Sequence, residues 1–61
     1  MSKNKCNTVI NKARICKDHL TTILGIAQDI DYPLFTHINS TILELEKIVH
    51  ESRSLREGYN D

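Results

Sequence analysis

The sequence predicts an all-α protein, an antiparallel hairpin of two helices that dimerises into a four-helix bundle. Two observations support this fold class: apolar residues recur at helical spacing in both halves of the chain, and a proline stands between the halves. Because the chain has 61 residues, we expect one small domain, residues 1–61. It should consist of a first helix at about 4–30, a turn at 31–33 and a second helix at about 34–57.

A seven-residue apolar repeat runs without a break through the first helix. Ile10 and Leu24 widen its stripe on one side, so the stripe is broader than the seam of a two-stranded coiled coil. A broad stripe of this kind is typical of a helix inside a bundle. The residues of this helix that we expect in the hairpin core or in the dimer interface are Val9, Ala13, Cys16, Leu20, Ile23, Ala27 and Ile30.

The apolar pattern breaks between Asp29 and Pro33. Proline has no amide hydrogen and disfavours the α conformation in the residue before it, so we expect the first helix to end just before Tyr32. Proline also suits the first turn of a helix, where Asp31 is close enough to cap the free amides. The segment therefore predicts a short turn between two helices.

The second helix shows apolar residues at spacings of three and four. Ser52 interrupts the series, and Gly58 predicts the end of the helix. The residues that we expect in the core or in the dimer interface are Phe35, Ile38, Ile42, Leu45 and Val49.

Charge is distributed unequally along a chain whose formal net charge is zero. Residues 1–30 carry five basic and two acidic side chains, a balance of +3, and residues 31–61 carry three basic and six acidic ones, a balance of −3. A fold at the predicted turn places residue i beside residue 63 − i, so basic residues of the first helix meet acidic residues of the second. The expected ion pairs, each worth about 0.2–1 kcal/mol, are Lys17 with Glu46, Lys12 with Glu51 and Lys5 with Glu57.

A single hairpin has no second layer to cover its apolar stripes. Disulfides or a metal stabilise other small domains, but Cys6 and Cys16 are too few for a disulfide scaffold and lack the C-x-x-C spacing of a zinc or redox site. We therefore expect a homodimer. Cys16 and His19 lie three residues apart on one helix and offer two metal ligands, but we expect Cys16 to act as a small apolar filler and no metal to be bound.

Catalytic motifs are absent from the sequence, which has neither a glycine-rich phosphate loop nor Ser-His-Asp spacing. We expect a protein that is not an enzyme and that uses no cofactor and no small-molecule substrate. The start of the chain has no apolar signal segment, and no apolar run approaches the roughly 20 residues that cross a bilayer. The expected location is the cytoplasm, without a membrane partner.

The stretch LTTILGIAQDI, residues 20–30, resembles the first helix of the dimerisation and phosphotransfer domain of bacterial sensor histidine kinases. In that family an acceptor-histidine motif, H-E-x-x-N-P-L, runs on into a similar apolar segment. Matching Leu20 to the leucine of the motif places Arg14 at the acceptor position, so the likeness lies in the scaffold. It implies a decoy that competes for a kinase or its response regulator, or a phosphotransfer module that uses His19 or His50.

The hairpin layout and the stretch NKARI, residues 11–15, are similar to Rop-type plasmid regulators. These regulators dimerise as antiparallel four-helix bundles and bind paired RNA loops with their first helices. The resemblance implies an RNA-binding regulator that uses the basic face of the first helix, with contacts from Lys3, Asn11, Ile15 and His19.

Taken together, these patterns favour a small non-enzymatic regulatory or inhibitory binding protein that acts through protein–protein contacts of a helical bundle. Its partners are expected to be a second copy of the chain and another protein, with RNA as an alternative. A glycine inside a helix costs about 1 kcal/mol relative to alanine, so Gly25 marks neutral drift or a place where another surface approaches closely. The expected binding residues are Lys3, Asn11, Lys12, Ile15, His19 and Gly25.

Overall fold

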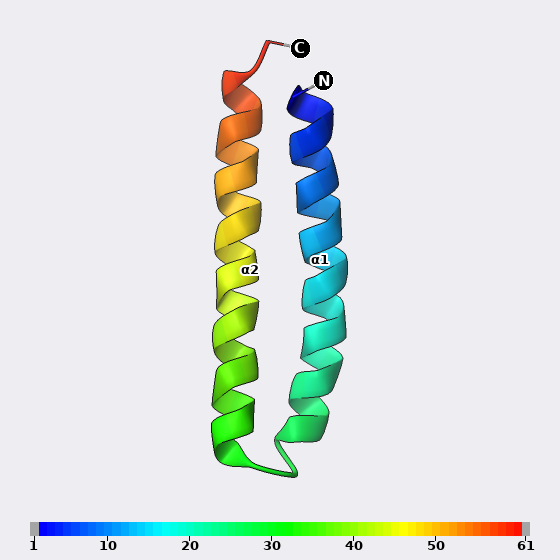
Figure 1. The fold of residues 1–61 in the computed structure, drawn as a ribbon, viewed down its shortest axis with the longest axis vertical. Coiled ribbons are helices and arrows are strands. Elements are labelled where there is room, and N and C mark those ends of the chain that lie inside the picture. The colour runs from blue at the N-terminus through cyan, green and yellow to red at the C-terminus, as the bar shows by residue number, and fades with distance from the viewer. Residues whose placement is uncertain (1, 61) are drawn as a thin grey trace.

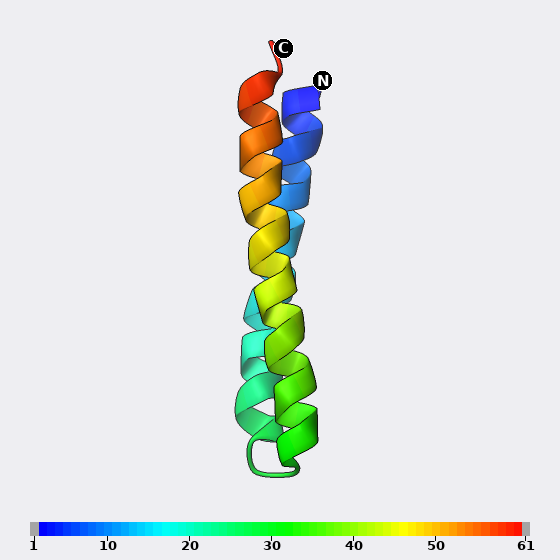
Figure 2. The same ribbon diagram turned by 90° about the vertical axis from the view of Figure 1, so that its left-hand side faces the viewer.

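A computed structural model describes residues 2–60 as two antiparallel helices, with no strand in that range. α1 spans Ser2–Ala27 and α2 spans Tyr32–Gly58, and the two run side by side for their whole length, with the chain ends at one end of the molecule (Figure 1). The Cα atoms extend over 47 × 14 × 9 Å. Figure 2 shows one helix largely in front of the other, so the hairpin is a single layer. The predicted all-α hairpin is confirmed.

The turn lies earlier than the sequence predicts. α1 ends at Ala27 rather than at residue 30, and α2 begins at Tyr32 rather than at residue 34. The amide of Asp29 donates to the carbonyl of Ile26 at 3.1 Å, and the amide of Ile30 donates to the carbonyl of Ala27 at 3.0 Å. Hydrogen bonds that reach back only three residues tighten the end of a helix and stop its propagation. Residues 28–31 therefore reverse the chain.

Asp31 starts the second helix, as predicted. Its backbone is extended, at φ −160° and ψ 127°, and its Oδ1 accepts a hydrogen bond from the amide of Leu34 at 3.2 Å. Pro33 lies in the first turn, where its missing amide hydrogen leaves no bond unmade. Because proline is placed there, Tyr32 belongs to the start of α2, and the expectation that the first helix continues to the residue before Tyr32 is wrong. α2 ends at Gly58, where the sequence predicts a stop.

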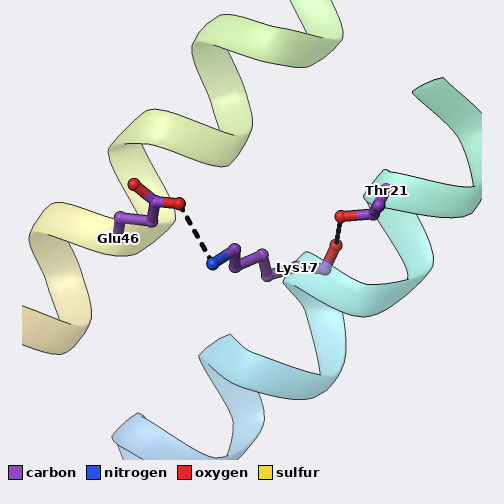
Figure 3. Close-up of polar contacts among 3 residues, drawn as sticks. All are labelled: Lys17, Thr21 and Glu46. Atoms are coloured by element: carbon purple, nitrogen blue, oxygen red, sulfur yellow. Dashed lines mark hydrogen bonds and ion pairs between the residues drawn. The ribbon is translucent and has the colours of Figure 1, made fainter.

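Two polar contacts determine the register of the helices. The Nζ of Lys17 lies 3.0 Å from Oε1 of Glu46 (Figure 3), and the Nη1 of Arg56 donates to Oδ1 of Asn7 at 2.7 Å. In each pair the two residue numbers add up to 63, as the sequence predicts. The described residues contain neither of the other two expected ion pairs, Lys12–Glu51 and Lys5–Glu57.

The core between the helices is thin. Ile10 and Ala27 are the most buried side chains, with 4% and 2% of their surface exposed, and small residues, Ala13 and Ser52, are also buried there. Ile10 enters the sequence prediction only as a flanking residue, yet it is central to this core. Of the other predicted core residues, Ile42 is buried, and those that are half-buried are Leu20, Phe35, Ile38, Leu45 and Val49.

Four predicted residues do not lie in the hairpin core. The repeat of the first helix has two apolar positions, and only one of them faces α2. One neighbouring helix covers only one arc of a cylinder, so the second position stays at the edge of the contact and is exposed. The exposed residues are Val9, Cys16, Ile23 and Ile30. Cys16 is therefore not buried within the single hairpin, and its burial in a dimer interface stays a prediction.

Candidate functional site

An apolar stripe remains exposed along α1. Val9, Cys16 and Ile23 follow one another at intervals of seven residues, and Ile30 continues the series into the turn. Val9 and Ile23 keep 45% and 46% of their surface exposed, and Ile30 keeps 70%. Single exposed apolar residues are common, but a continuous row of them marks a contact surface.

α2 carries a matching exposed stripe. Leu34, Thr41, Ile48 and Leu55 also follow one another at intervals of seven residues, and the three aliphatic members are 42–59% exposed. Thr41 fits into this row because its hydroxyl already donates to the carbonyl of His37 at 3.0 Å. Burial of Thr41 against a partner would therefore leave no hydroxyl without a hydrogen bond.

The two stripes lie on the same flank of the hairpin. Successive residues of a helix are about 100° apart around its axis. Cys16 and Lys17 therefore lie on opposite sides of the part of α1 that packs against α2. Ile48 and Glu46 border the buried arc of α2 on opposite sides in the same way. Because Lys17 and Glu46 form an ion pair on one flank, Cys16 and Ile48 lie on the other. We call the eight residues on that flank the apolar face: Val9, Cys16, Ile23, Ile30, Leu34, Thr41, Ile48 and Leu55.

The register of the hairpin arranges the apolar face in layers. Two residues, one from each helix, lie at nearly the same height along the hairpin when their numbers add up to 63 or 64. Successive layers are about 10 Å apart, since seven residues of a helix rise by that length. From the chain ends to the turn, the layers are Val9 with Leu55, Cys16 with Ile48, Ile23 with Thr41, and Ile30 with Leu34.

Opposite charges border the apolar face on its two sides. The row next to the α1 stripe, again at intervals of seven residues, contains Lys5, Lys12 and His19, which are all exposed. The row next to the α2 stripe contains His37, Glu44 and Glu51, which are also exposed. We call these sets the α1 rim and the α2 rim. The α1 rim is basic and the α2 rim carries two carboxylates.

The flank opposite the apolar face is polar. A shallow depression between the helices is bordered by Arg14, Lys17, Glu46, Val49, His50 and Arg53. Three of these side chains are cationic and one is a carboxylate, which is held by Lys17 (Figure 3). The backbone carbonyl of Lys17 also accepts a hydrogen bond from the hydroxyl of Thr21 at 2.9 Å, so this hydroxyl is satisfied within α1 (Figure 3).

The residues predicted to bind a partner are dispersed. Asn11, Ile15 and His19 are exposed and follow one another at intervals of four on the outer side of α1, whereas Lys3 is half-buried. Lys12 lies on the α1 rim. Gly25 is exposed on the outer side of α1, and a methyl group added to it would meet no atom within 4 Å. In the hairpin, therefore, no surface approaches Gly25 closely.

Among residues 2–60, the side chains that could ligate a metal are dispersed. Cys6 is half-buried and Cys16 is exposed, and both are free thiols. Within residues 2–60, no three His, Cys, Asp or Glu side chains gather into a group that could hold a metal ion. His19 and His50 lie on different helices.

Comparisons of the chain with protein-family models, with curated proteins and with solved structures find no match. Neither described helix is both long and apolar enough to cross a membrane. Sequence reasoning missed the division of the apolar residues into a buried set and an exposed set. The two apolar positions within each seven-residue repeat indicate that two sets exist, but they do not indicate which set faces the other helix.

Proposed function

We propose that the chain is a non-catalytic binding module that acts through protein–protein contacts of its apolar face, in a regulatory or inhibitory role. The observation that supports this function is the continuity of the apolar face, which follows both helices from the chain ends to the turn. No bond is made or broken in such a mechanism. The hairpin occupies an apolar surface of its partner and excludes competitors from it.

The energetics favour a covered face. Burial of a whole aliphatic side chain contributes about 1.5–3 kcal/mol, so covering the exposed half of one such residue contributes roughly 1 kcal/mol. The face has six aliphatic residues besides Cys16 and Thr41. Their combined contribution is comparable with the whole stability of a small domain, so the hairpin gains much of its stability from whatever covers this face.

The experiment compares three baits in affinity capture from the cells that produce the protein. Ile23→Asp places a charge on the apolar face. Ile15→Asp places the same charge on the same helix outside the face, at an isoleucine that is 52% exposed against 46% for Ile23. The wild type and Ile15→Asp are expected to retain the same binding partner, and Ile23→Asp is expected to lose it. Equal capture by all three baits would contradict the proposed function.

A second pair of variants, on α2, tests whether both helices contribute to binding. Ile48→Asp changes the apolar face, and Leu43→Asp changes an exposed leucine outside it. Capture should again be lost only for the variant in the face. Circular dichroism of all four variants shows whether a loss of binding accompanies a loss of helix.

A second candidate function, RNA binding, is favoured by the depression on the opposite flank. Arg14, Lys17 and Arg53 surround a single carboxylate there, and cations that both helices contribute would suit a phosphate backbone. Gel shifts with structured RNA at low and high salt test it. Affinity that falls steeply with salt and weakens in Arg14→Ala would support RNA binding, and no shift at low salt would remove this candidate.

A further inference from the structure

We infer that a second copy of this chain covers the apolar face, related by a two-fold axis that runs along the length of the hairpin. The two turns then lie at the same end of a four-helix bundle, and α1 of each copy stacks on α2 of the other. This inference rests on the proposed function, because it names the partner of the same face. The area of the apolar face, the symmetry of a dimer and the charges of the two rims support it.

The area of the face suits a second copy. The Cα atoms of one hairpin extend over 47 Å by 14 Å, so the outline of its face has an area of about 660 Å² before the side chains are added. A stable interface buries about 800 Å² per partner, so stacking along the full length of the hairpin is needed to reach that value. An identical hairpin has the same length and width and covers the whole face.

The accessible surface of the single hairpin is larger than that of a typical monomer of the same mass. The hairpin exposes 4715 Å², whereas a compact monomer of 7.0 kDa exposes about 4,000 Å². The excess is close to the area of one face. A single copy is therefore less compact than a typical monomer of its mass, and covering one face lowers the exposed surface of each chain.

Face-to-face stacking about a two-fold axis allows two arrangements. An axis along the length of the hairpin stacks α1 on α2 of the second copy, with the turns together. An axis across the length stacks α1 on α1 and α2 on α2, with the turns at opposite ends. Neighbouring helices are antiparallel in both arrangements, so helix direction does not distinguish them.

The rims distinguish the two arrangements. Stacking α1 on α1 brings the basic α1 rim against itself and brings Glu44 and Glu51 against the same two residues of the second copy. Stacking α1 on α2 brings each basic rim against an acidic one. Like charges across an interface weaken it and opposite charges stabilise it, so the second arrangement is favoured.

The register places individual charges opposite each other in the favoured arrangement. Lys12 of one copy is level with Glu51 of the second, and His19 is level with Glu44, because both pairs of numbers add up to 63. In the described part of the single hairpin, Lys12 and Glu51 take part in no ion pair. They lie on opposite edges of the face, so a second copy supplies to each of them a partner that its own chain does not.

Packing in the layers is also consistent with this arrangement. Each layer of one copy meets the same layer of the other, so Cys16 lies beside Ile48 of the second copy and Ile23 lies beside its Thr41. A small side chain thus faces a large one in both central layers. Complementary volumes of this kind let the two faces approach closely without a cavity.

The experiment reverses one charge on each rim. In Lys12→Glu, a homodimer has two pairs of facing carboxylates, and in Glu51→Lys it has two pairs of facing ammonium groups. Each variant is expected to dimerise roughly tenfold more weakly than the wild type by light scattering and native mass spectrometry at low salt. A mixture of the two variants is expected to form heterodimers of near wild-type affinity, because every rim pair in the heterodimer is again of opposite charge.

Two controls carry the same charge changes outside the face. Arg14→Glu lies on the opposite flank and Asp18→Lys lies on the outer side of α1, and both residues are exposed. Both are expected to dimerise like the wild type. High salt should reduce the differences among all variants, because the rim pairs are exposed to solvent.

Two results would overturn the inference. A wild-type chain that remains a monomer at high protein concentration would exclude the second copy as the occupant. A dimer whose two charge variants show no preference for each other on mixing would exclude the arrangement. A monomer that still captures another protein, and loses it in Ile23→Asp, would overturn only this inference and leave the proposed function standing.

Discussion

At the residue scale, one side chain does most to place the turn. Asp31 adopts an extended backbone and its carboxylate accepts the amide of Leu34, while the carbonyl of the same residue accepts the amide of Phe35 at 3.1 Å. The capped helix start and Pro33 together define where α2 begins. The Tyr32 and Phe35 rings stack beside the cap, with centroids 6.1 Å apart.

Replacement of this cap should lower stability. Asp31→Ala removes the acceptor for the amide of Leu34, so we expect the free energy of unfolding to fall by about 1 kcal/mol. Asp31→Asn retains an oxygen acceptor, so its free energy of unfolding should fall much less. Urea denaturation followed by circular dichroism measures both variants. A loss in Asp31→Asn as large as that in Asp31→Ala would show that charge, and not the cap, matters.

At the element scale, each helix divides its apolar residues between two surfaces. In α1, Ala13 and Ala27 face α2 and allow a close approach of the helices, while Val9 and Ile23 lie on the apolar face. The inner surface is too small to stabilise a helix of this length strongly. The apolar face, once it is covered, therefore contributes to the stability of the helix.

Gly25 offers a clean test of helix propensity within α1. It lies inside the helix, on the outer side, and its added methyl group would contact no atom within 4 Å. We expect Gly25→Ala to raise the free energy of unfolding by about 0.5–1 kcal/mol, because alanine restricts the unfolded chain and favours the helix. Thermal unfolding measures this change. A lower midpoint would mean that another surface approaches Gly25 in the assembled protein.

At the scale of the whole molecule, the single layer leaves the apolar face without cover. Stability should then depend on protein concentration, because only the assembled form buries the face. A rise of about a hundredfold in concentration is expected to raise the unfolding midpoint of the wild type by roughly 10 °C. Scanning calorimetry or circular dichroism at several concentrations measures it.

Ile23→Asp is the control for this prediction. With a charge on the apolar face, the remaining helix should melt at a midpoint that is independent of concentration and lower than that of the wild type. A wild-type midpoint that does not move with concentration would contradict the self-association on which the prediction depends.

The sequence by itself determined the class of fold and the pairing of the two helices. Apolar spacing predicted both helices, Pro33 and Asp31 predicted the turn, and the opposite charges of the two halves predicted the Lys17–Glu46 pair. These features were predictable because each depends on residues close in the chain or on a register that one turn determines. The limits of the helices were less accurate, because the hydrogen bonds that end α1 depend on backbone geometry and leave no signal in residue type.

Only the tertiary structure decided which apolar residues are buried and which remain exposed. Ile10 and Val9 are neighbours of similar chemistry, yet Ile10 is 4% exposed and Val9 is 45% exposed. The periodicity of a helix places both near one stripe and does not say on which side of it the second helix packs. That choice depends on the angle at which the chain returns from the turn, so the apolar face and its charged rims became visible only when both helices were placed together.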